Sequence, residues 1–356
     1  MTRKDRLLAA MPADIDGLFV TSELNQYYFS GFDFTDGYVL ITRKKSYLIT
    51  DFRYIEAAHN IVGSEFEIIM PEQSMGLEIA ALLKENEVKK LWFEDKTLSC
   101  ADYLRFSELF EGLEMVRGGS DAVDALREVK TEDEVEKMAK AQAITDAAFT
   151  HILEFIKPDM TEIEVALELE FFMRAHGARS TAFDTIAVSG SASSLPHGVP
   201  RNVKLERGFF TMDYGARYEG YCSDMTRTIV LGKADADMKK LYETVLNAQL
   251  AGIAMIKEGE NGMAIDKVAR DIIEGAGYKG CFGHGLGHGV GMFIHESPRL
   301  SPKASPEKKL VSGNVVTCEP GIYIAGRYGC RIEDMLLVTK DGHMDFTHSP
   351  KNLIEI

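Results

Sequence analysis

The pattern of apolar and polar residues divides the chain into an alternating first third and a longer, internally repeated remainder. In the first third, short apolar runs predict strands at 16–20, 37–41, 46–50, 66–70 and 90–95. Between them, apolar residues at helical spacing predict helices at 76–86 and 101–110. Alternating strands and helices predict an α/β layer domain. This part has no clustered polar chemistry, so we expect it to assist assembly or to cover a cleft.

From about residue 120 the pattern changes to pairs of helices, each pair followed by strands. Capping boxes at Thr131–Glu134 and Thr161–Glu164 begin the first two helices. Helices predicted at about 237–258 and 262–274 repeat this order, and strands again follow them. We therefore expect two related halves with pseudo-twofold symmetry and a site at their junction.

The strands of the two halves contain related sequences, DYGARYEGYCSDM and EPGIYIAGRYGCRIEDM. In the first, Asp213 and Asp224 are symmetric about the Tyr218–Glu219 bond. In an antiparallel hairpin centred there, the two carboxylates would face each other with Cβ atoms ~5 Å apart. We expect this facing arrangement in the first hairpin.

The second sequence places Glu319 and Glu333 symmetrically about Gly326, which predicts a second facing pair of acids. Close like charges destabilise a fold unless a cation lies between them. Four carboxylates around one point would be balanced by two divalent cations. His288, in the segment GHGLGHGVG, adds an imidazole to these oxygen ligands, a combination that suits divalent metals.

Composition narrows the possible partners. The net charge of −15 argues against nucleic acid, because phosphate binding needs a basic face. No apolar run reaches eighteen residues and the N-terminus does not resemble a secretory signal, so we expect a cytoplasmic protein with no membrane partner.

The cysteines are odd in number and widely spaced, which favours reduced, buried thiols over a cysteine nucleophile; they are Cys100, Cys222, Cys281, Cys318 and Cys330. No βαβ unit surrounds the glycine-rich segment, which excludes a dinucleotide loop.

With these motifs assembled, the chain resembles the pita-bread metallopeptidase family, above all Xaa-Pro dipeptidases (prolidases) and Xaa-Pro aminopeptidases. The resemblance rests on GHGLGHGVGMFIHESP, EPGIY and RIEDMLLVT, at the right spacing from Asp213 and Asp224. It implies a mixed α/β (α+β) protein with a creatinase-type N-terminal α/β domain at 1–122 and a pseudo-twofold catalytic domain at 123–356.

The resemblance also implies a role for each ligand. Asp213 would bind one metal, His288 and Glu319 the other, and Asp224 and Glu333 would bridge both. Manganese is the first choice of ion, with cobalt, zinc or iron as alternatives, because this ligand set does not select one metal. A hydroxide bridging the two ions would attack the carbonyl before a proline in a short peptide.

Further residues match family positions around the substrate. Glu319 matches a proton shuttle, and His197, His284 and His295 match cleft histidines, of which His197 and His295 would contact the substrate. Tyr323 and Arg299 match substrate-binding positions, with Arg299 binding the free carboxylate of a dipeptide. Arg331 matches a cation that orients a bridging carboxylate.

The resemblance favours a prolidase and leaves alternatives. The runner-up is an Xaa-Pro aminopeptidase that acts on longer peptides. Methionine aminopeptidases share the ligand set but usually lack the N-terminal domain. A non-catalytic pita-bread binding protein is disfavoured, because such members have lost ligands that this chain retains. By analogy with the family, we expect a homodimer.

Overall fold

The computed structural model describes all residues, 1–356. The chain forms two compact units, residues 1–127 and 128–356. They divide at the end of α6 (Gly119–Glu128), whereas the sequence placed the division at 122/123. None of the helices combines the length and apolar character that a bilayer-spanning helix needs.

The first unit is built on a six-stranded mixed sheet with the order β4-β3-β2-β1-β5-β6. Its strands are β1 (Gly17–Val20), β2 (Gly37–Thr42), β3 (Ser46–Thr50), β4 (Glu67–Ile69), β5 (Lys90–Phe93) and β6 (Glu114–Val116). The other helices are α1 (Arg3–Ala10), α2 (Glu23–Ser30), α3 (Ile55–Ile61), α4 (Met75–Glu85) and α5 (Cys100–Leu109). All five strands and both helices predicted for this part are present. The structure adds α1, α2, α3, α6 and β6, which the sequence analysis did not predict.

The second unit contains the expected repeat of a helix pair followed by strands. The first half has α7 (Glu132–Phe155), α8 (Glu162–Ala175), β7 (Ser180–Thr181), β8 (Ile186–Ser189), β9 (Gly208–Tyr214), β10 (Ala216–Tyr218), β11 (Tyr221–Cys222) and β12 (Met225–Leu231). The second half has α9 (Ala236–Met255), α10 (Gly262–Gly275), β13 (Gly287–Gly289), β14 (Glu296–Leu300), β15 (Val315–Cys318), β16 (Gly321–Ile324), β17 (Tyr328–Arg331), β18 (Asp334–Val338) and β19 (His343–Asp345).

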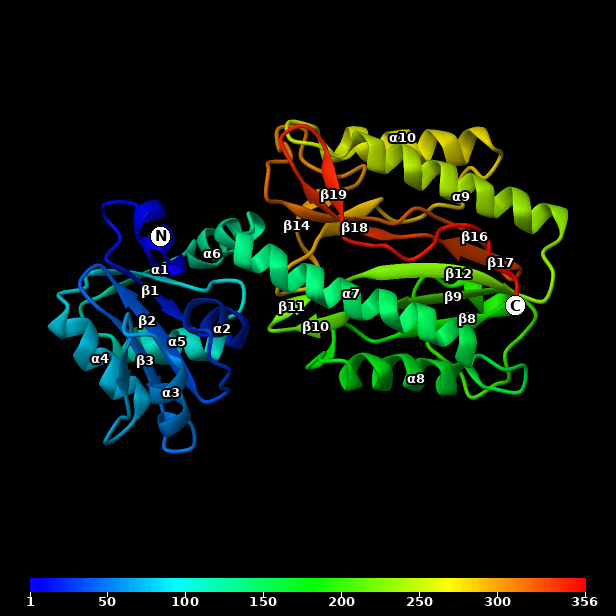
Figure 1. Cartoon of the computed structure of the whole chain (residues 1–356). Helices are drawn as coiled ribbons and strands as arrows, with labels where there is room; N and C mark the ends of the chain where they lie inside the picture. Colours follow the sequence, from blue (N-terminus) through cyan, green and yellow to red (C-terminus); the bar gives the residue numbers. More distant parts are fainter. The chain divides into compact units, whose positions relative to one another are not determined.

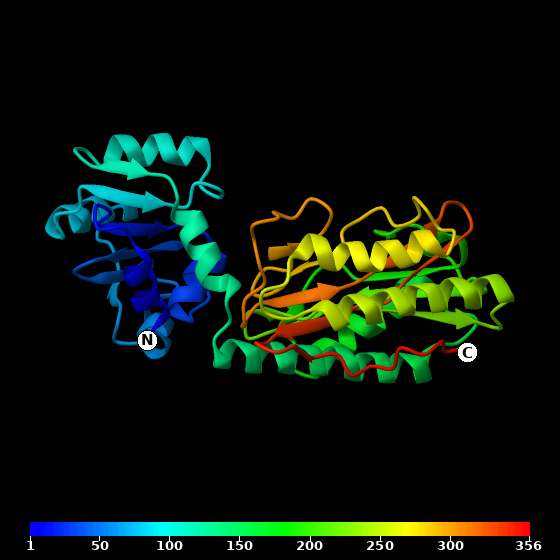
Figure 2. The same ribbon diagram turned by 90° about the horizontal axis from the view of Figure 1, so that it is seen from above.

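The two helix pairs cover opposite sides of the strands in this unit (Figures 1 and 2). Helices α7 and α8 pack against strands of the first half, and α9 and α10 pack against strands of the second. The main sheets have the orders β12-β9-β8 and β14-β13-β15-β18-β19. The strands therefore have one face toward their own helices and the other toward the opposite half.

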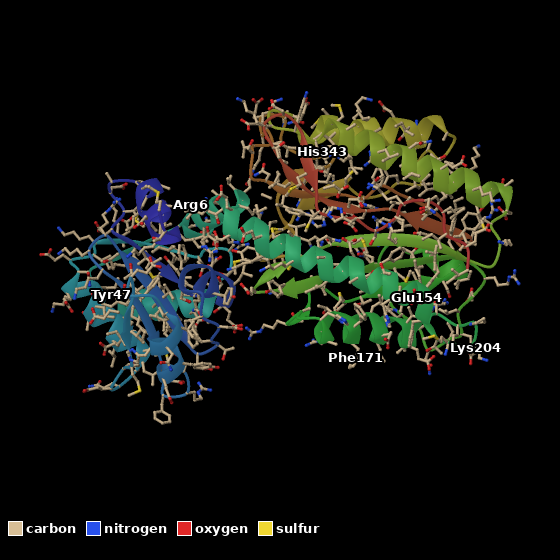
Figure 3. The ribbon with its side chains drawn as sticks, in the orientation of Figure 1. Arg6, Tyr47, Glu154, Phe171, Lys204 and His343 are labelled. Carbon is tan, nitrogen blue, oxygen red and sulfur yellow. The ribbon has the colours of Figure 1, made fainter.

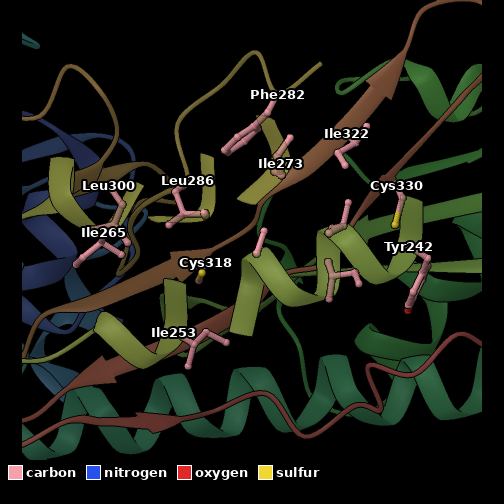
Figure 4. Packing of buried hydrophobic residues seen from close by; sticks show 14 of the residues in the cluster. Tyr242, Ile253, Ile265, Ile273, Phe282, Leu286, Leu300, Cys318, Ile322 and Cys330 are labelled. Atoms are coloured by element: carbon pink, nitrogen blue, oxygen red, sulfur yellow. The ribbon is translucent and has the colours of Figure 1, made fainter. Parts of the chain in front are cut away.

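Each half has its own hydrophobic core. Phe210, Met212 and Tyr214 of β9 belong to the core beneath α7 and α8. Val316 and Cys318 of β15 belong to the core beneath α9 and α10, part of which is shown in Figure 4. Because side chains alternate along a strand, neighbouring positions on β9 and β15 point away from the helices, toward the space between the halves.

Candidate metal centre

The four acids lie at the positions that face away from the two cores. Asp213 on β9 alternates with Met212 and Tyr214, and Glu319 directly follows Cys318 of β15. Asp224 and Glu333 immediately precede β12 and β18, at the matching places of the two halves. Strand alternation thus explains how charged side chains occur within otherwise buried strand segments.

The register predicted for the first hairpin is wrong by two residues. Asp213 pairs with Thr226, not with Asp224, across β9 and β12. The reason is the turn: Tyr218 pairs with Tyr221, so the loop is Glu219–Gly220, one residue later than predicted. A shift of two residues leaves side chains on the same face, so Asp224 remains a diagonal neighbour of Asp213 on that face.

The register of the second hairpin agrees with the prediction. Cys318 pairs with Asp334 and Gly321 with Arg331, so Glu319 and Glu333 stand opposite each other at the break between two ladders.

His288 lies on β13, where the flanking glycines permit very close backbone packing. A Cβ atom on Gly287 would lie 2.0 Å from the carbonyl oxygen of Thr317, and one on Gly289 would lie 2.1 Å from that of Ser297. Only glycine fits at either position, because real Cβ atoms do not approach oxygen this closely. The glycine-rich segment thereby lets β13 insert between β14 and β15 and bring His288 to the acids.

The hydrogen bonding of His288 fixes its tautomer. Nδ1 lies 3.1 Å from the carbonyl oxygen of Gly289, which only accepts, so Nδ1 carries the proton. The bare Nε2 lies 3.5 Å from Asp224 Oδ2 and 3.4 Å from Glu319 Oε1. A lone pair that faces two carboxylates is unfavourable unless a metal cation or a proton lies between them. Asp224, His288 and Glu333 each present a ligand atom within 4.8 Å of the others.

Arg331 and Thr226 hold the acids from behind. Arg331 NH2 donates to Asp213 Oδ2 at 2.6 Å, and its Nε donates to Thr226 Oγ1 at 3.0 Å. Thr226 in turn donates to Glu333 Oε2 at 2.7 Å. The sequence singled out Arg331 but missed Thr226. Its position two residues after Asp224, on the same strand face, is the signal that could have found it.

Burial and mutual repulsion strongly raise the pKa values of three of the acids. Burial and the charge of Glu333 hold the pKa of Asp224 well above its usual value. Burial and the charge of Glu319 do the same to the pKa of Glu333. Burial raises the pKa of Glu319 to about 8 and lowers the pKa of His288 to about 3. The positively charged groups of the chain therefore do not neutralise these carboxylates.

A cavity of about 1060 Å³ opens onto the acids. It is lined by all five predicted ligands and by other predicted site residues, namely His197, His284, His295, Arg299 and Arg331. The structure thus brings together every predicted site residue except Tyr323, which does not line the cavity. Its hydroxyl lies 2.7 Å from Arg331 NH1 and 3.0 Å from His284 Nε2, so its expected substrate contact stays a prediction.

The residues of this centre fit a divalent cation. Asp213 Oδ1 is buried without a hydrogen-bond partner, and the His288 lone pair faces two carboxylates. Oxygen donors with one imidazole suit manganese, cobalt, iron or zinc. The five cysteines are unpaired, and none lines the cavity.

Comparisons with known proteins agree with this geometry. The chain is 36% identical to the Xaa-Pro dipeptidase of Pyrococcus furiosus, over 99% of each chain. Its structure matches an Xaa-Pro dipeptidase from Bacillus anthracis with a TM-score of 0.95 and 44% identity, over 99% of each chain. It also matches an X-Pro aminopeptidase from Thermotoga maritima with a TM-score of 0.92 and 33% identity, over 99% of this chain and 100% of the other.

Two family models cover most of the chain. Residues 3–129 match the creatinase/prolidase N-terminal domain, and residues 136–340 match metallopeptidase family M24. The expected fold is confirmed: a creatinase-type α/β domain precedes a pita-bread catalytic domain. The chain therefore belongs to metallopeptidase family M24.

Proposed function

We propose that this metallopeptidase is an Xaa-Pro dipeptidase that uses two divalent ions, with manganese as the first ion to test. Asp213 would hold one ion, His288 and Glu319 the other, and Asp224 and Glu333 would bridge them. The ions supply Lewis acidity and generate a nucleophile from water near neutral pH. The similarity to Xaa-Pro dipeptidases across nearly the whole chain supports this assignment.

The chain's own residues have separable roles in this proposal. Glu319 lines the cavity and is the most exposed of the four acids, with 16% of its side chain accessible. It would therefore carry a proton to the leaving proline nitrogen. Burial lowers the pKa of His284 to about 4, so this imidazole is neutral at pH 7. His197 and His295 line the same cavity, where each could donate a hydrogen bond to the reacting carbonyl.

The observation that carries the preference for dipeptides is the free guanidinium of Arg299. Arg299 lines the cavity that contains the acids and forms no ion pair with any carboxylate of the chain. A dipeptide bound with its scissile carbonyl at the acids has a carboxylate only one residue further on. Arginine suits this group because its planar fork binds a carboxylate through two hydrogen bonds.

An Xaa-Pro aminopeptidase is the second candidate. A cavity of about 1060 Å³ is large enough for more than two residues, and the Thermotoga maritima structure bears that name.

Hydrolysis of Ala-Pro and of Ala-Pro-Ala, after loading with manganese, cobalt or zinc, tests the proposal. Cleavage confined to Ala-Pro supports a dipeptidase, and preference for Ala-Pro-Ala makes the chain an aminopeptidase. Cleavage of neither by any metal form would favour a non-catalytic binding protein. We also propose a homodimer, and a solution mass of 39.6 kDa would contradict it.

A further inference from the structure

His197 depends on its backbone for its position in the cavity. The residue is exposed and lines the cavity, but its imidazole forms no hydrogen bond or ion pair with the chain. The direction of this side chain is therefore set by the segment that carries it, between β8 and β9. A freely moving segment would not hold the imidazole at one place.

One buried carboxylate ties together the two ends of this segment. Glu162, the first residue of α8, has a fully buried side chain. On the N-terminal side of His197, Ser189 donates hydrogen bonds to Glu162 Oε1 from its backbone N at 2.7 Å and from its Oγ at 2.8 Å. After His197, Arg201 donates to the same carboxylate from its backbone N and its Nε, both at 2.9 Å, and from NH2 at 2.6 Å. The carboxylate thus closes the segment 189–201 into a loop.

The middle of the loop is also held close to the centre. The carbonyl oxygen of Pro196 accepts from Arg331 NH1 at 3.3 Å, and Arg331 binds Asp213. A Cβ atom on Gly198 would lie 2.9 Å from Val188 Cγ1, so the backbone after His197 packs directly on β8. His197 therefore sits between two restrained neighbours, and Glu162 restrains the ends.

The second half of the catalytic unit has an equivalent anchor. Asn261, the N-cap of α10, donates from Nδ2 to the carbonyl oxygens of Ser305, Pro306 and Lys308 at 2.9–3.0 Å. The segment 301–310 also lines the cavity. Isolated bridges join Thr161 to Lys204 in one half and Asn261 to Lys309 in the other. In both halves the start of the second helix anchors a cavity-lining loop. The anchor at the start of α8 includes an ion pair, whereas the anchor at the start of α10 is an uncharged asparagine.

We infer that Glu162 and Arg201 are a positioning pair that holds His197 at the cavity. The effect of this pair on hydrolysis rests on the proposed function. The pair acts through the loop, since neither side chain is among the residues that line the cavity. Weakening it should therefore affect catalysis only when His197 is present.

Arg201→Met is the direct test, because Arg201 is 38% exposed and its truncation is less disruptive than loss of the buried Glu162. The matched control is Lys204→Ala, an exposed residue without an ion pair that lies three positions after Arg201, in the same connection between β8 and β9 (Figure 3). In the manganese-loaded protein, we expect Arg201→Met to lower kcat/KM for Ala-Pro by about 10- to 100-fold, since small misplacements have large effects. Arg201→Lys should recover part of the loss.

A double-mutant cycle separates positioning from general damage. His197→Ala should abolish the effect of Arg201→Met, so that the double variant equals His197→Ala. Multiplied losses in the double variant would overturn the inference.

Amide hydrogen exchange gives a readout that is independent of activity. Exchange in residues 195–206 should rise in Arg201→Met and stay unchanged in Lys204→Ala. No rise in Arg201→Met would overturn the inference whatever the activity. If the wild type does not cleave Ala-Pro but the exchange still rises, the proposed function fails and the anchoring of the loop stands.

Discussion

At the scale of single residues, the four acids differ in how far the chain itself compensates their charge. Asp213 has Arg331 at 2.6 Å, whereas Glu333 has only the hydroxyl of Thr226. Asp224 and Glu319 face the bare nitrogen of His288, which carries no charge near neutral pH because burial holds its pKa at about 3. Glu319 also accepts one long hydrogen bond, at 3.4 Å, from the Thr317 hydroxyl. The uncompensated acids are those that a cation would stabilise most.

Thr226 should orient Glu333 for metal binding. Thr226→Val removes both hydrogen bonds of the hydroxyl and leaves Arg331 Nε without its acceptor. We expect manganese affinity to fall by about 10- to 100-fold, as is usual when a group that orients a ligand is lost. Calorimetric titration measures the change. Thr226→Ser keeps the hydroxyl and should restore most of the affinity, and equal affinities of all three proteins would contradict this role.

Arg299 should act on the free carboxylate of the substrate. Arg299→Met should lower kcat/KM for Ala-Pro by roughly 10- to 100-fold, which corresponds to about 1.5–3 kcal/mol for hydrogen bonds to a charged group. Ala-Pro-amide lacks the carboxylate, so its hydrolysis should barely change. Equal losses for the two substrates would show that Arg299 has another function.

The sequence revealed the charged residues of the centre but not the groups that hold them. Asp213, Asp224, His288, Glu319 and Glu333 stand out because charges are unusual in such strand-like or glycine-rich segments. Thr226 does not stand out, since threonine is an ordinary strand residue. Its role comes from the pairing of β12 with β9 and from contacts more than 100 residues away, which no local pattern contains.

At the scale of elements, periodicity located the long helices well. The predicted helices 237–258 and 262–274 correspond to α9 and α10 within a few residues. The turn of the first hairpin was misplaced because Glu219 gives no turn signal, although its φ is +45° and that of Gly220 is +85°. A two-residue loop with both φ values positive is a type I′ turn, which favours Asn-Gly.

This turn offers a test of the hairpin geometry. Glu219→Asn should stabilise the protein by about 0.5–1 kcal/mol, because asparagine tolerates positive φ better than glutamate. The lost ion pair with Lys137 is long, at 3.7 Å, and partly exposed to solvent, so it is worth little. Thermal unfolding should show a small rise in Tm for Glu219→Asn and a fall for Gly220→Ala. A fall for both would contradict the assigned turn.

At the scale of the whole molecule, the catalytic unit has two halves, each with its own hydrophobic core, and each half contributes two acids to one centre. Neither half alone contains all five proposed ligands, and the four carboxylates repel one another when no cation is present. The sequence predicted this arrangement through its internal repeat. It did not predict how the loops 189–201 and 301–310, which contribute residues to the lining of the cavity, are anchored, because these loops have no periodic pattern.

The metal-free protein should lose stability as the pH rises. The pKa values of Asp224, Glu319 and Glu333 are raised in the folded chain, so the folded state binds protons more tightly than the unfolded state. The stability that this protonation contributes is complete below about pH 4, under the unfolded pKa values. It is lost as the pH rises through the folded pKa, which is about 8 for Glu319. We expect the Tm of chelator-treated protein to fall between about pH 6 and pH 9. Manganese-saturated protein is the control and should change less. A rising Tm in the metal-free protein would contradict these shifts.

We propose that divalent ions held by the five ligands drive cleavage before proline. The most direct measurement is the rate of Ala-Pro hydrolysis as manganese is added stepwise to the metal-stripped protein, with Asp224→Asn alongside. We predict that wild-type activity rises from near zero and saturates at about two ions per chain, as expected for a two-metal site, and that Asp224→Asn stays inactive. Activity without metal, or full activity in Asp224→Asn, would contradict the account.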